Sequence, residues 1–283
     1  MNIGVNTLIW GASFGPSDFH LLPRIRDAGF DGIEVPIFDP HVFEARAVGR
    51  ELNRFGLERT AVTIIPRGLS LGASDGSIRA RAIEHVRACI AAARDAGIHL
   101  LSGPIYTPVG HLTGRRRTDD EWRWVVDSWQ QLSGDVNAAQ MEIGIEPLNR
   151  FETYFLNTVQ DALALCDGIG DPSIGILLDT FHANIEEKSV SDAVRHAAPH
   201  LKHLHACEND RGVPGSGHVE WPEFFAAVAE IGYTRWLTIE SFGFSIEAIA
   251  AAAAIWRDLA PSADDIAFEG IRFLRRGLRA APP

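Results

Sequence analysis

The sequence predicts an α/β fold in which eight strands alternate with eight helices in one closed (β/α)8 barrel, or TIM barrel. Short apolar segments alternate with longer helical ones along all 283 residues. The composition does not change along the chain, and the hydrophobic content of 46% is ample for one continuous core. The Gly-x-Gly-x-x-Gly pattern typical of a dinucleotide-binding fold is absent after the first expected strand. We therefore expect a single barrel domain over residues 1–283.

The first half of the chain contains four strand-and-helix units. Their strands are expected at residues 3–9, 32–35, 60–65 and 99–103, and their helices up to residue 28 and at 44–55, 77–96 and 118–140. Gly29, Gly56 and Gly97 follow the first three helices, because glycine readily adopts the left-handed conformation that ends a helix. Residues 104–117 form a long loop, and such a loop in a compact domain usually has a functional role.

The second half contains four further units. Their strands are expected at residues 143–146, 174–179, 201–205 and 236–240, and their helices near 158–167, 188–198, 221–231 and 244–259. Pro222 lies near the start of the third of these helices, where the missing N–H of proline costs little. Residues 266–279 predict an additional amphipathic helix at the C-terminus that packs across the barrel.

Each strand of the second half ends in a residue that can bind a metal ion or transfer a proton. These residues are Glu146, Asp179, His205 and Glu240. Successive members are separated by about one unit of roughly 30 residues. Side chains alternate between the two faces of a strand, so the aliphatic neighbours face the helices and these four face the barrel interior. Since the active site of such a barrel lies at the carboxyl ends of its strands, we expect the four to meet there.

Three carboxylates and one imidazole suit a divalent ion such as Mn²⁺, Mg²⁺ or Co²⁺, with coordination positions left open for substrate oxygens. A closed structural zinc site would contain thiolates, but Cys89, Cys166 and Cys207 are widely spaced and form no Cys-x-x-Cys pair. One such polar residue alone would more often belong to a buried ion pair. Four at equivalent positions in successive units favour a metal site.

The charge and hydropathy of the chain disfavour two classes of partner. The formal net charge of −11 would repel a polyanion, and the compact basic group at Arg115, Arg116 and Arg117 is more typical of a solvated loop, so we expect no nucleic-acid partner. No apolar run approaches the roughly 18 to 20 residues of a membrane span, and the N-terminus lacks a signal-peptide pattern. We therefore expect no membrane partner and a cytoplasmic location.

Longer motifs surround the four strand-end residues. They are Glu146-Pro-Leu-Asn-Arg-Phe-Glu152, Leu178-Asp-Thr-Phe-His-Ala-Asn-Ile-Glu-Glu187, His203-Leu-His205 with Glu208 and Arg211, and Ile239-Glu-Ser-Phe242. In these motifs the chain resembles the ketose 3-epimerase family, typified by D-tagatose, D-psicose and L-ribulose 3-epimerases, within the xylose isomerase-like superfamily. Gly29-Phe-Asp-Gly-Ile-Glu34 and Ile255-Trp-Arg-Asp-Leu259 extend the resemblance over most of the chain.

The resemblance implies roles for individual residues. It makes Glu146, Asp179, His205 and Glu240 the ligands of a divalent ion, with Mn²⁺ expected first and Co²⁺ or Mg²⁺ as alternatives, and it makes the two glutamates the proton-transfer pair. The same resemblance assigns substrate contacts to the three residues Glu152, His182 and Arg211, and it implies a homodimer or homotetramer.

Other residues near the expected site have plainer interpretations as well. Without the motifs, Glu152 would be an ordinary loop charge and His182 a packing residue at a helix start. We expect His203 to lie one layer deeper than His205, in a structural or supporting role. Trp10 is expected to form a wall of the site, whereas Asn6 stands where many relatives carry an aromatic residue.

The expected reaction is inversion at C3 of a free keto-sugar. An ion bound to the C2 carbonyl and C3 hydroxyl oxygens acidifies the C3 proton, because it stabilises the enediolate that forms. One glutamate then removes the proton and the other returns one to the opposite face. A sugar phosphate held by the glycine-containing loop at residues 211–217 is a less favoured substrate.

Four other functions remain open for this sequence. An aldose–ketose or hydroxypyruvate-type isomerase would use the same ion and carboxylates, and an inosose-type dehydratase is a third candidate. An endonuclease IV-like repair enzyme would require more histidines and a basic face for DNA. A non-catalytic sugar-binding barrel would have no need of acid–base residues at both Glu146 and Glu240.

Overall fold

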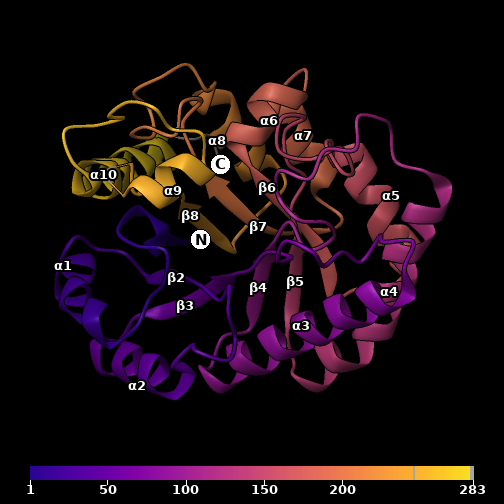
Figure 1. Ribbon diagram of the computed structural model, residues 1–283. Coiled ribbons are helices and arrows are strands. Elements are labelled where there is room, and N and C mark those ends of the chain that lie inside the picture. Colours follow the sequence, from indigo (N-terminus) through magenta and orange to yellow (C-terminus); the bar gives the residue numbers. More distant parts are fainter. Residues whose placement is uncertain (245, 281–283) are drawn as a thin grey trace.

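The computed structural model describes residues 1–244 and 246–280, and its strands form a closed parallel barrel (Figure 1). Neighbouring strands pair in chain order, and β1 pairs with β8 to close the barrel. The strands are β1 (Asn2–Asn6), β2 (Gly32–Pro36), β3 (Glu58–Val62), β4 (Leu100–Gly103), β5 (Glu142–Ile145), β6 (Ile174–Asp179), β7 (Leu201–Ala206) and β8 (Trp236–Ile239). The fold class predicted from the sequence is confirmed.

Helices surround the barrel (Figure 1). They are α1 (Leu22–Asp27), α2 (Ala45–Phe55), α3 (Gly76–Asp95), α4 (Asp119–Ala138), α5 (Val159–Ile169), α6 (Thr180–Glu186), α7 (Val190–Ala197), α8 (Trp221–Glu230), α9 (Glu247–Ala252) and α10 (Ala263–Ala280), with 3-10 helices η1 (Thr7–Ile9) and η2 (Pro16–Leu21) near the N-terminus. The expected C-terminal helix is α10, which packs beside η1, α8 and β8. In the described part of the chain, none of the helices combines the length and the apolar character that crossing a membrane requires.

The first unit differs from the prediction made for it. A strand was expected at residues 3–9, but β1 ends at Asn6 and η1 follows at once. The Asn6 side chain accepts a hydrogen bond from the N–H of Leu8 (2.9 Å), which caps the 3-10 helix. The expected helix up to residue 28 is divided between η2 and α1. The cap formed by the Asn6 side chain therefore ends the strand, although the β-branched residues that follow favour its continuation.

Three further predictions about elements were wrong in detail. The third strand was expected at residues 60–65 but is β3, which begins earlier because Glu58 N donates to Asp31 O (3.0 Å). Helix α6 was not predicted; it begins directly after β6, where the Asp179 side chain accepts from Phe181 N (2.6 Å). The helix expected at 244–259 is limited to α9 among the described residues, and Ala254 has a positive φ of 53°.

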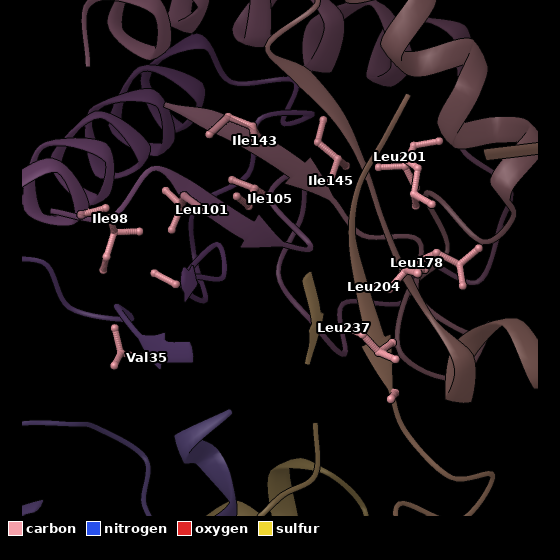
Figure 2. Packing of buried hydrophobic residues seen from close by; sticks show 14 of the residues in the cluster. Val35, Ile98, Leu101, Ile105, Ile143, Ile145, Leu178, Leu201, Leu204 and Leu237 are labelled. Carbon is pink, nitrogen blue, oxygen red and sulfur yellow. The ribbon is translucent and has the colours of Figure 1, made fainter. Parts of the chain in front are cut away.

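The outer face of the barrel is aliphatic. Ile143 and Ile145 of β5, Leu204 of β7 and Leu237 of β8 belong to the continuous buried core (Figure 2). Fully burying one such side chain stabilises a fold by roughly 1.5–3 kcal/mol. Their alternation with inward residues is the parity that the sequence predicted, and it directs the polar side chains of the same strands into the barrel.

The long loop at residues 104–117 is fixed at both ends of its exposed part. Gly110 N donates to Glu152 O (2.7 Å), which joins this loop to the loop after β5. Near the start of α4, both Arg115 Nη atoms donate to Glu121 (2.8 and 2.9 Å), and the Tyr154 hydroxyl also donates to Glu121 (2.9 Å). Thr118 caps α4 by accepting from Glu121 N (3.2 Å). The Glu121 carboxylate therefore joins the loop to the start of α4 and to Tyr154.

Replacing Glu121 by glutamine is expected to reduce stability in a pH-dependent way. Arg115 is the main cause that lowers the pKa of Glu121 from 4.5 to about 2, against the opposing effect of burial. The ionised group therefore stabilises the fold above about pH 4.5, and this contribution is lost as the pH falls towards 2. We expect Glu121→Gln to lower the free energy of unfolding by about 1.5–3 kcal/mol at pH 7, because a hydrogen bond to a charged group typically contributes that much.

Urea unfolding of both proteins at pH 7 and at pH 3 measures this effect. The difference between wild type and variant should be smaller at pH 3, because part of the wild-type stabilisation has then been titrated away. An equal difference at both pH values would contradict a role for the ionised carboxylate.

Candidate active site

Four polar side chains meet at the carboxyl ends of β5 to β8. Glu146 follows β5, Asp179 ends β6, His205 lies in β7 and Glu240 follows β8. All four are buried, and one potential ligand atom from each lies within 4.8 Å of those of the others. The structure therefore brings together the whole set expected from strand parity and spacing. We call this set the carboxylate cluster.

The carboxylate cluster carries an excess of negative charge. His205 Nδ1 lies 3.3 Å from Glu240 Oε1 and 3.8 Å from Asp179 Oδ2. Arg211 Nη1 lies 2.9 Å from Glu240 Oε2 and 3.3 Å from Asp179 Oδ2. One guanidinium and one imidazole thus face three carboxyl groups in a buried space. A divalent cation would reduce the mutual repulsion of these carboxylates.

Two buried atoms of the carboxylate cluster also lack hydrogen-bond partners among the described residues. They are Glu146 Oε1 and His205 Nδ1. A buried polar atom left without a partner costs about 1–3 kcal/mol. The other ring nitrogen of His205, Nε2, is engaged 2.7 Å from Glu34 Oε1, so Nδ1 is the atom that faces the carboxylate cluster. Oxygen and imidazole donors in this arrangement fit a divalent metal ion.

The pKa values of the two glutamates are displaced in opposite directions. Burial, and then the negative charge of Glu240, raise the pKa of Glu146 well above its ordinary value. Burial also acts to raise the pKa of Glu240, but the nearby His205 and Arg211 outweigh it and the pKa is lowered. One carboxyl group therefore tends to hold a proton while the other tends to be ionised.

A cavity of about 350 Å³ opens above the carboxylate cluster. Glu146 and Glu240 lie on its surface together with Glu152, His182 and Arg211, the three residues expected to contact substrate. The remaining wall is largely apolar and is formed by Leu8, Ala12, Phe38, Val62, Thr63, Ile64, Gly103, Pro104, Val109, Leu148, Phe242 and Ala253. The charged and titratable groups of the lining thus all come from the second half of the barrel, as does the carboxylate cluster.

Asn149 orients two of the substrate-side residues. Its backbone N–H donates to His182 Nδ1 (3.1 Å), and its side-chain amide donates to Glu152 Oε1 (2.8 Å). The His182 side chain is buried, and this burial is the main cause that lowers its pKa to about 3, so its ring is neutral. Nδ1 therefore accepts, while Nε2 lies 3.3 Å from Arg211 Nη2 and 3.8 Å from Glu146 Oε1.

Arg211 is held by its surroundings in a sparsely populated backbone conformation, with φ of 67°. Its guanidinium carbon lies 3.9 Å from the ring centre of Phe181 and 4.7 Å from that of Phe242. Such stacking is favourable for a cation. Ser241 Oγ donates to Arg211 O (2.6 Å), and Arg211 N donates to Glu208 O (2.9 Å). Arg211 is therefore fixed along both its backbone and its side chain.

Trp10 does not lie where the sequence placed it. Its indole Nε1 donates to Asp264 Oδ1 (2.9 Å), and its ring packs against Phe268, with centroids 6.3 Å apart. It is also absent from the residues that line the cavity. The 3-10 helix after Asn6 carries Trp10 towards α10, and Leu8 and Ala12 line the cavity instead.

Sequence reasoning gave no role to Glu34, although it reaches the carboxylate cluster from below. Its carboxylate contacts His203 Nε2 (2.8 Å) and His205 Nε2 (2.7 Å), and Asn6 Nδ2 lies 3.0 Å from it and 3.3 Å from Glu240. Burial would raise the pKa of Glu34, but the two histidines outweigh it and hold the pKa well below its ordinary range. Strand parity was the available signal, because a strand at 32–35 directs Glu34 inward.

The chain has the fold of a xylose isomerase-like TIM barrel, and the model of that family matches residues 22–276. The chain is 37% identical to a protein of Synechocystis sp. named probable ketose 3-epimerase, over 98% of this chain and 96% of that protein. It is 31% identical to the L-ribulose 3-epimerase of Mesorhizobium japonicum, over 99% and 95% of the two chains.

Two solved structures are similarly close. An L-ribulose 3-epimerase superposes with a TM-score of 0.93 at 31% identity, covering 98% of this chain and 94% of that one. The D-allulose 3-epimerase of Methylomonas sp., solved in complex with D-allulose, has a TM-score of 0.91 at 26% identity, covering 98% and 96%. The chain belongs to the ketose 3-epimerase family, and it is an isomerase of the sugar epimerase class.

Proposed function

We propose that this protein is a divalent-metal-dependent epimerase that inverts C3 of a free keto-sugar. One observation carries the proposal. Glu146 and Glu240, which follow β5 and β8, come together in the carboxylate cluster beneath a cavity large enough for a sugar. Inversion requires a proton to leave one face of a carbon and return to the other, which two separate carboxyl groups can accomplish. Relatives named as ketose 3-epimerases support the same reaction.

The carboxylate cluster would hold the ion through Glu146, Asp179, His205 and Glu240. Mn²⁺ is the proposed ion, with Co²⁺ or Mg²⁺ as alternatives, because oxygen-rich sites with one imidazole suit such ions. When bound, the ion would polarise the C2 carbonyl and C3 hydroxyl oxygens of the ketose and thereby acidify the C3 proton.

The two glutamates would divide the proton transfer between them. One glutamate would accept the C3 proton, and the other would supply a proton to the opposite face of the carbon. In the reverse reaction the two groups would exchange roles.

Glu152, His182 and Arg211 would orient the sugar. The guanidinium of Arg211 can donate to sugar oxygens, and Glu152 can accept from a hydroxyl. The buried His182 ring lies between Asn149 and Arg211 on the same side of the cavity. The relatives solved with D-allulose and D-tagatose support a ketohexose as one substrate. A homodimer or homotetramer is the proposed assembly, on the resemblance to the family alone.

The loop that carries Arg211 favours an unphosphorylated sugar. Several of its backbone N–H groups are already engaged within the protein, since Gly212 N donates to Asp210 (2.9 Å), and Gly215 N and Val219 N donate to Glu208 (2.7 and 3.1 Å). A phosphate site of the backbone type requires such groups to point at the ligand. A free ketose is therefore the better match to this cavity.

A panel of ketohexoses and ketopentoses in D₂O with Mn²⁺, followed by NMR, tests the proposed function. The expected result is the C3 epimer of at least one ketose, with deuterium incorporated at C3 and the ketose skeleton retained. An aldehyde product would instead identify an aldose–ketose isomerase. Loss of water with a new conjugated absorbance would identify a dehydratase.

A further inference from the structure

Glu34 lies directly below the carboxylate cluster and is completely buried. Each of its carboxylate oxygens accepts two hydrogen bonds. Oε1 accepts from Asn6 Nδ2 (3.0 Å) and His205 Nε2 (2.7 Å). Oε2 accepts from Thr60 Oγ1 (2.9 Å) and His203 Nε2 (2.8 Å). Both oxygens are therefore fully used, and the carboxylate cannot rotate without breaking contacts on both sides.

These contacts decide which nitrogen of His205 carries a proton. An ionised carboxylate only accepts hydrogen bonds, so His205 Nε2 must donate to Glu34. A neutral His205 ring then carries its lone pair on Nδ1. That atom lies in the carboxylate cluster, 3.3 Å from Glu240 and 3.8 Å from Asp179, and it lacks a hydrogen-bond partner among the described residues. The geometry thus directs one particular nitrogen towards the position of an ion.

The same network reaches one of the proposed catalytic glutamates. Asn6 Nδ2 donates to Glu34 Oε1 and lies 3.3 Å from Glu240 Oε1. Asn6 is itself fixed, because its Oδ1 accepts from Leu8 N (2.9 Å) at the start of η1. Two members of the carboxylate cluster, His205 in β7 and Glu240 directly after β8, are therefore tied to one deeper carboxylate.

We propose that Glu34 is a positioning residue for the metal site, which fixes the His205 tautomer so that Nδ1 binds the ion and which also holds Glu240 through Asn6. The proposal rests on the proposed function, since it assumes a divalent ion in the carboxylate cluster. Glu34 would not touch the ion or the sugar. Partners of this kind around metal-bound histidines typically contribute 10- to 100-fold to metal affinity.

A second ion held by Glu34, His203 and His205 is the competing interpretation of the same residues, since their potential ligand atoms also lie close together. All the contacts of Glu34 with the two rings have the length of ordinary hydrogen bonds. Thr60 and Asn6 occupy the remaining acceptor positions of the carboxylate. Protein donors therefore fill the acceptor positions of the Glu34 carboxylate, which leaves none for a further ion.

The first experiment compares Mn²⁺ binding by isothermal titration calorimetry to wild type, Glu34→Gln and Glu142→Gln, each first freed of metal. Glutamine keeps the shape of Glu34 but has a single acceptor oxygen, so one imidazole loses its acceptor. We expect one ion per chain and affinity weakened about 10- to 100-fold in Glu34→Gln. Glu142, which pairs with Lys202 and Arg235 at the start of β5, is the matched control and should keep wild-type affinity.

Each outcome of the titration has a distinct meaning. Affinity of Glu34→Gln within threefold of wild type would overturn the positioning role while leaving the proposed function intact. Two ions per chain in wild type and one in Glu34→Gln would make Glu34 a ligand and would also overturn it. A wild-type protein that binds no divalent ion would overturn the proposed function itself, and this proposal with it.

A second experiment needs no variant and so does not depend on the folding of Glu34→Gln. In the Co²⁺-loaded wild-type protein, proton NMR should show one paramagnetically shifted imidazole N–H that exchanges slowly with D₂O. Slow exchange is expected because His205 Nε2–H is buried and donates to Glu34. Complete exchange of such a signal within the time of mixing would contradict the assigned tautomer and its partner.

Discussion

Replacing either Glu146 or Glu240 by glutamine is expected to reduce kcat for C3 epimerisation by about 10²- to 10⁴-fold, the usual contribution of a general acid or base. Glutamine retains an oxygen donor and nearly the same shape, but it can neither accept nor supply the proton. Because both residues also belong to the carboxylate cluster, the assays should be run with saturating Mn²⁺. Turnover is measured from each of the two C3 epimers separately.

Solvent exchange distinguishes two catalytic groups from one. In D₂O, the variant that keeps Glu240 should still exchange the C3 proton of one epimer, and the variant that keeps Glu146 should exchange that of the other. Equal loss of exchange from both epimers in both variants would contradict a separate base on each face. Glu142→Gln, at the opposite end of the barrel, serves as the control and should epimerise at the wild-type rate.

Removal of divalent ions by a chelator is expected to abolish turnover and to lower the melting temperature. The carboxylate cluster buries three carboxyl groups together, and Arg211 is the guanidinium that faces two of them. A ligand that binds only the folded state at 100 times its Kd stabilises that state by about 2.7 kcal/mol. Calorimetric melting and the C3 exchange assay, each with and without added Mn²⁺, measure the two effects.

Adding single metal ions back to the chelated protein identifies the ion that supports activity. Dialysis against chelator, followed by Mn²⁺, Co²⁺ or Mg²⁺ in separate samples, should return activity and melting temperature together. Asp179→Asn provides the matched variant, because it removes one charge from the carboxylate cluster without removing a proposed proton-transfer group. Full activity after exhaustive chelation would contradict the metal-dependent mechanism.

The sequence was sufficient to predict the barrel and the members of the carboxylate cluster, because both depend on regular patterns. A strand directs alternate residues to one face, and a barrel aligns the carboxyl ends of its strands. Asp179 and His205, for example, are paired across β6 and β7. No knowledge of loop structure is needed to place these two side chains at the same end of the barrel.

Features that depend on loop structure or on contacts between distant residues could not be predicted from such regular patterns. Trp10 follows a 3-10 helix whose direction depends on the Asn6 cap and on Asp264, a residue from the other end of the chain. Asp179 ends β6, and its side chain also caps the start of α6. The sequence pattern indicates only the first of these two roles. The role of Glu34 becomes visible only when β2 and β7 are placed in one barrel.

The carboxylate cluster and most of the apolar wall of the cavity come from different halves of the barrel. Every member of the carboxylate cluster belongs to the second half, whereas Leu8, Ala12, Phe38, Ile64 and Val109, among others, belong to the first. Mutations in the first half can therefore alter the shape offered to a sugar without touching the proposed catalytic groups. Selection for a new ketose, in evolution or in the laboratory, could begin with a library confined to those wall positions.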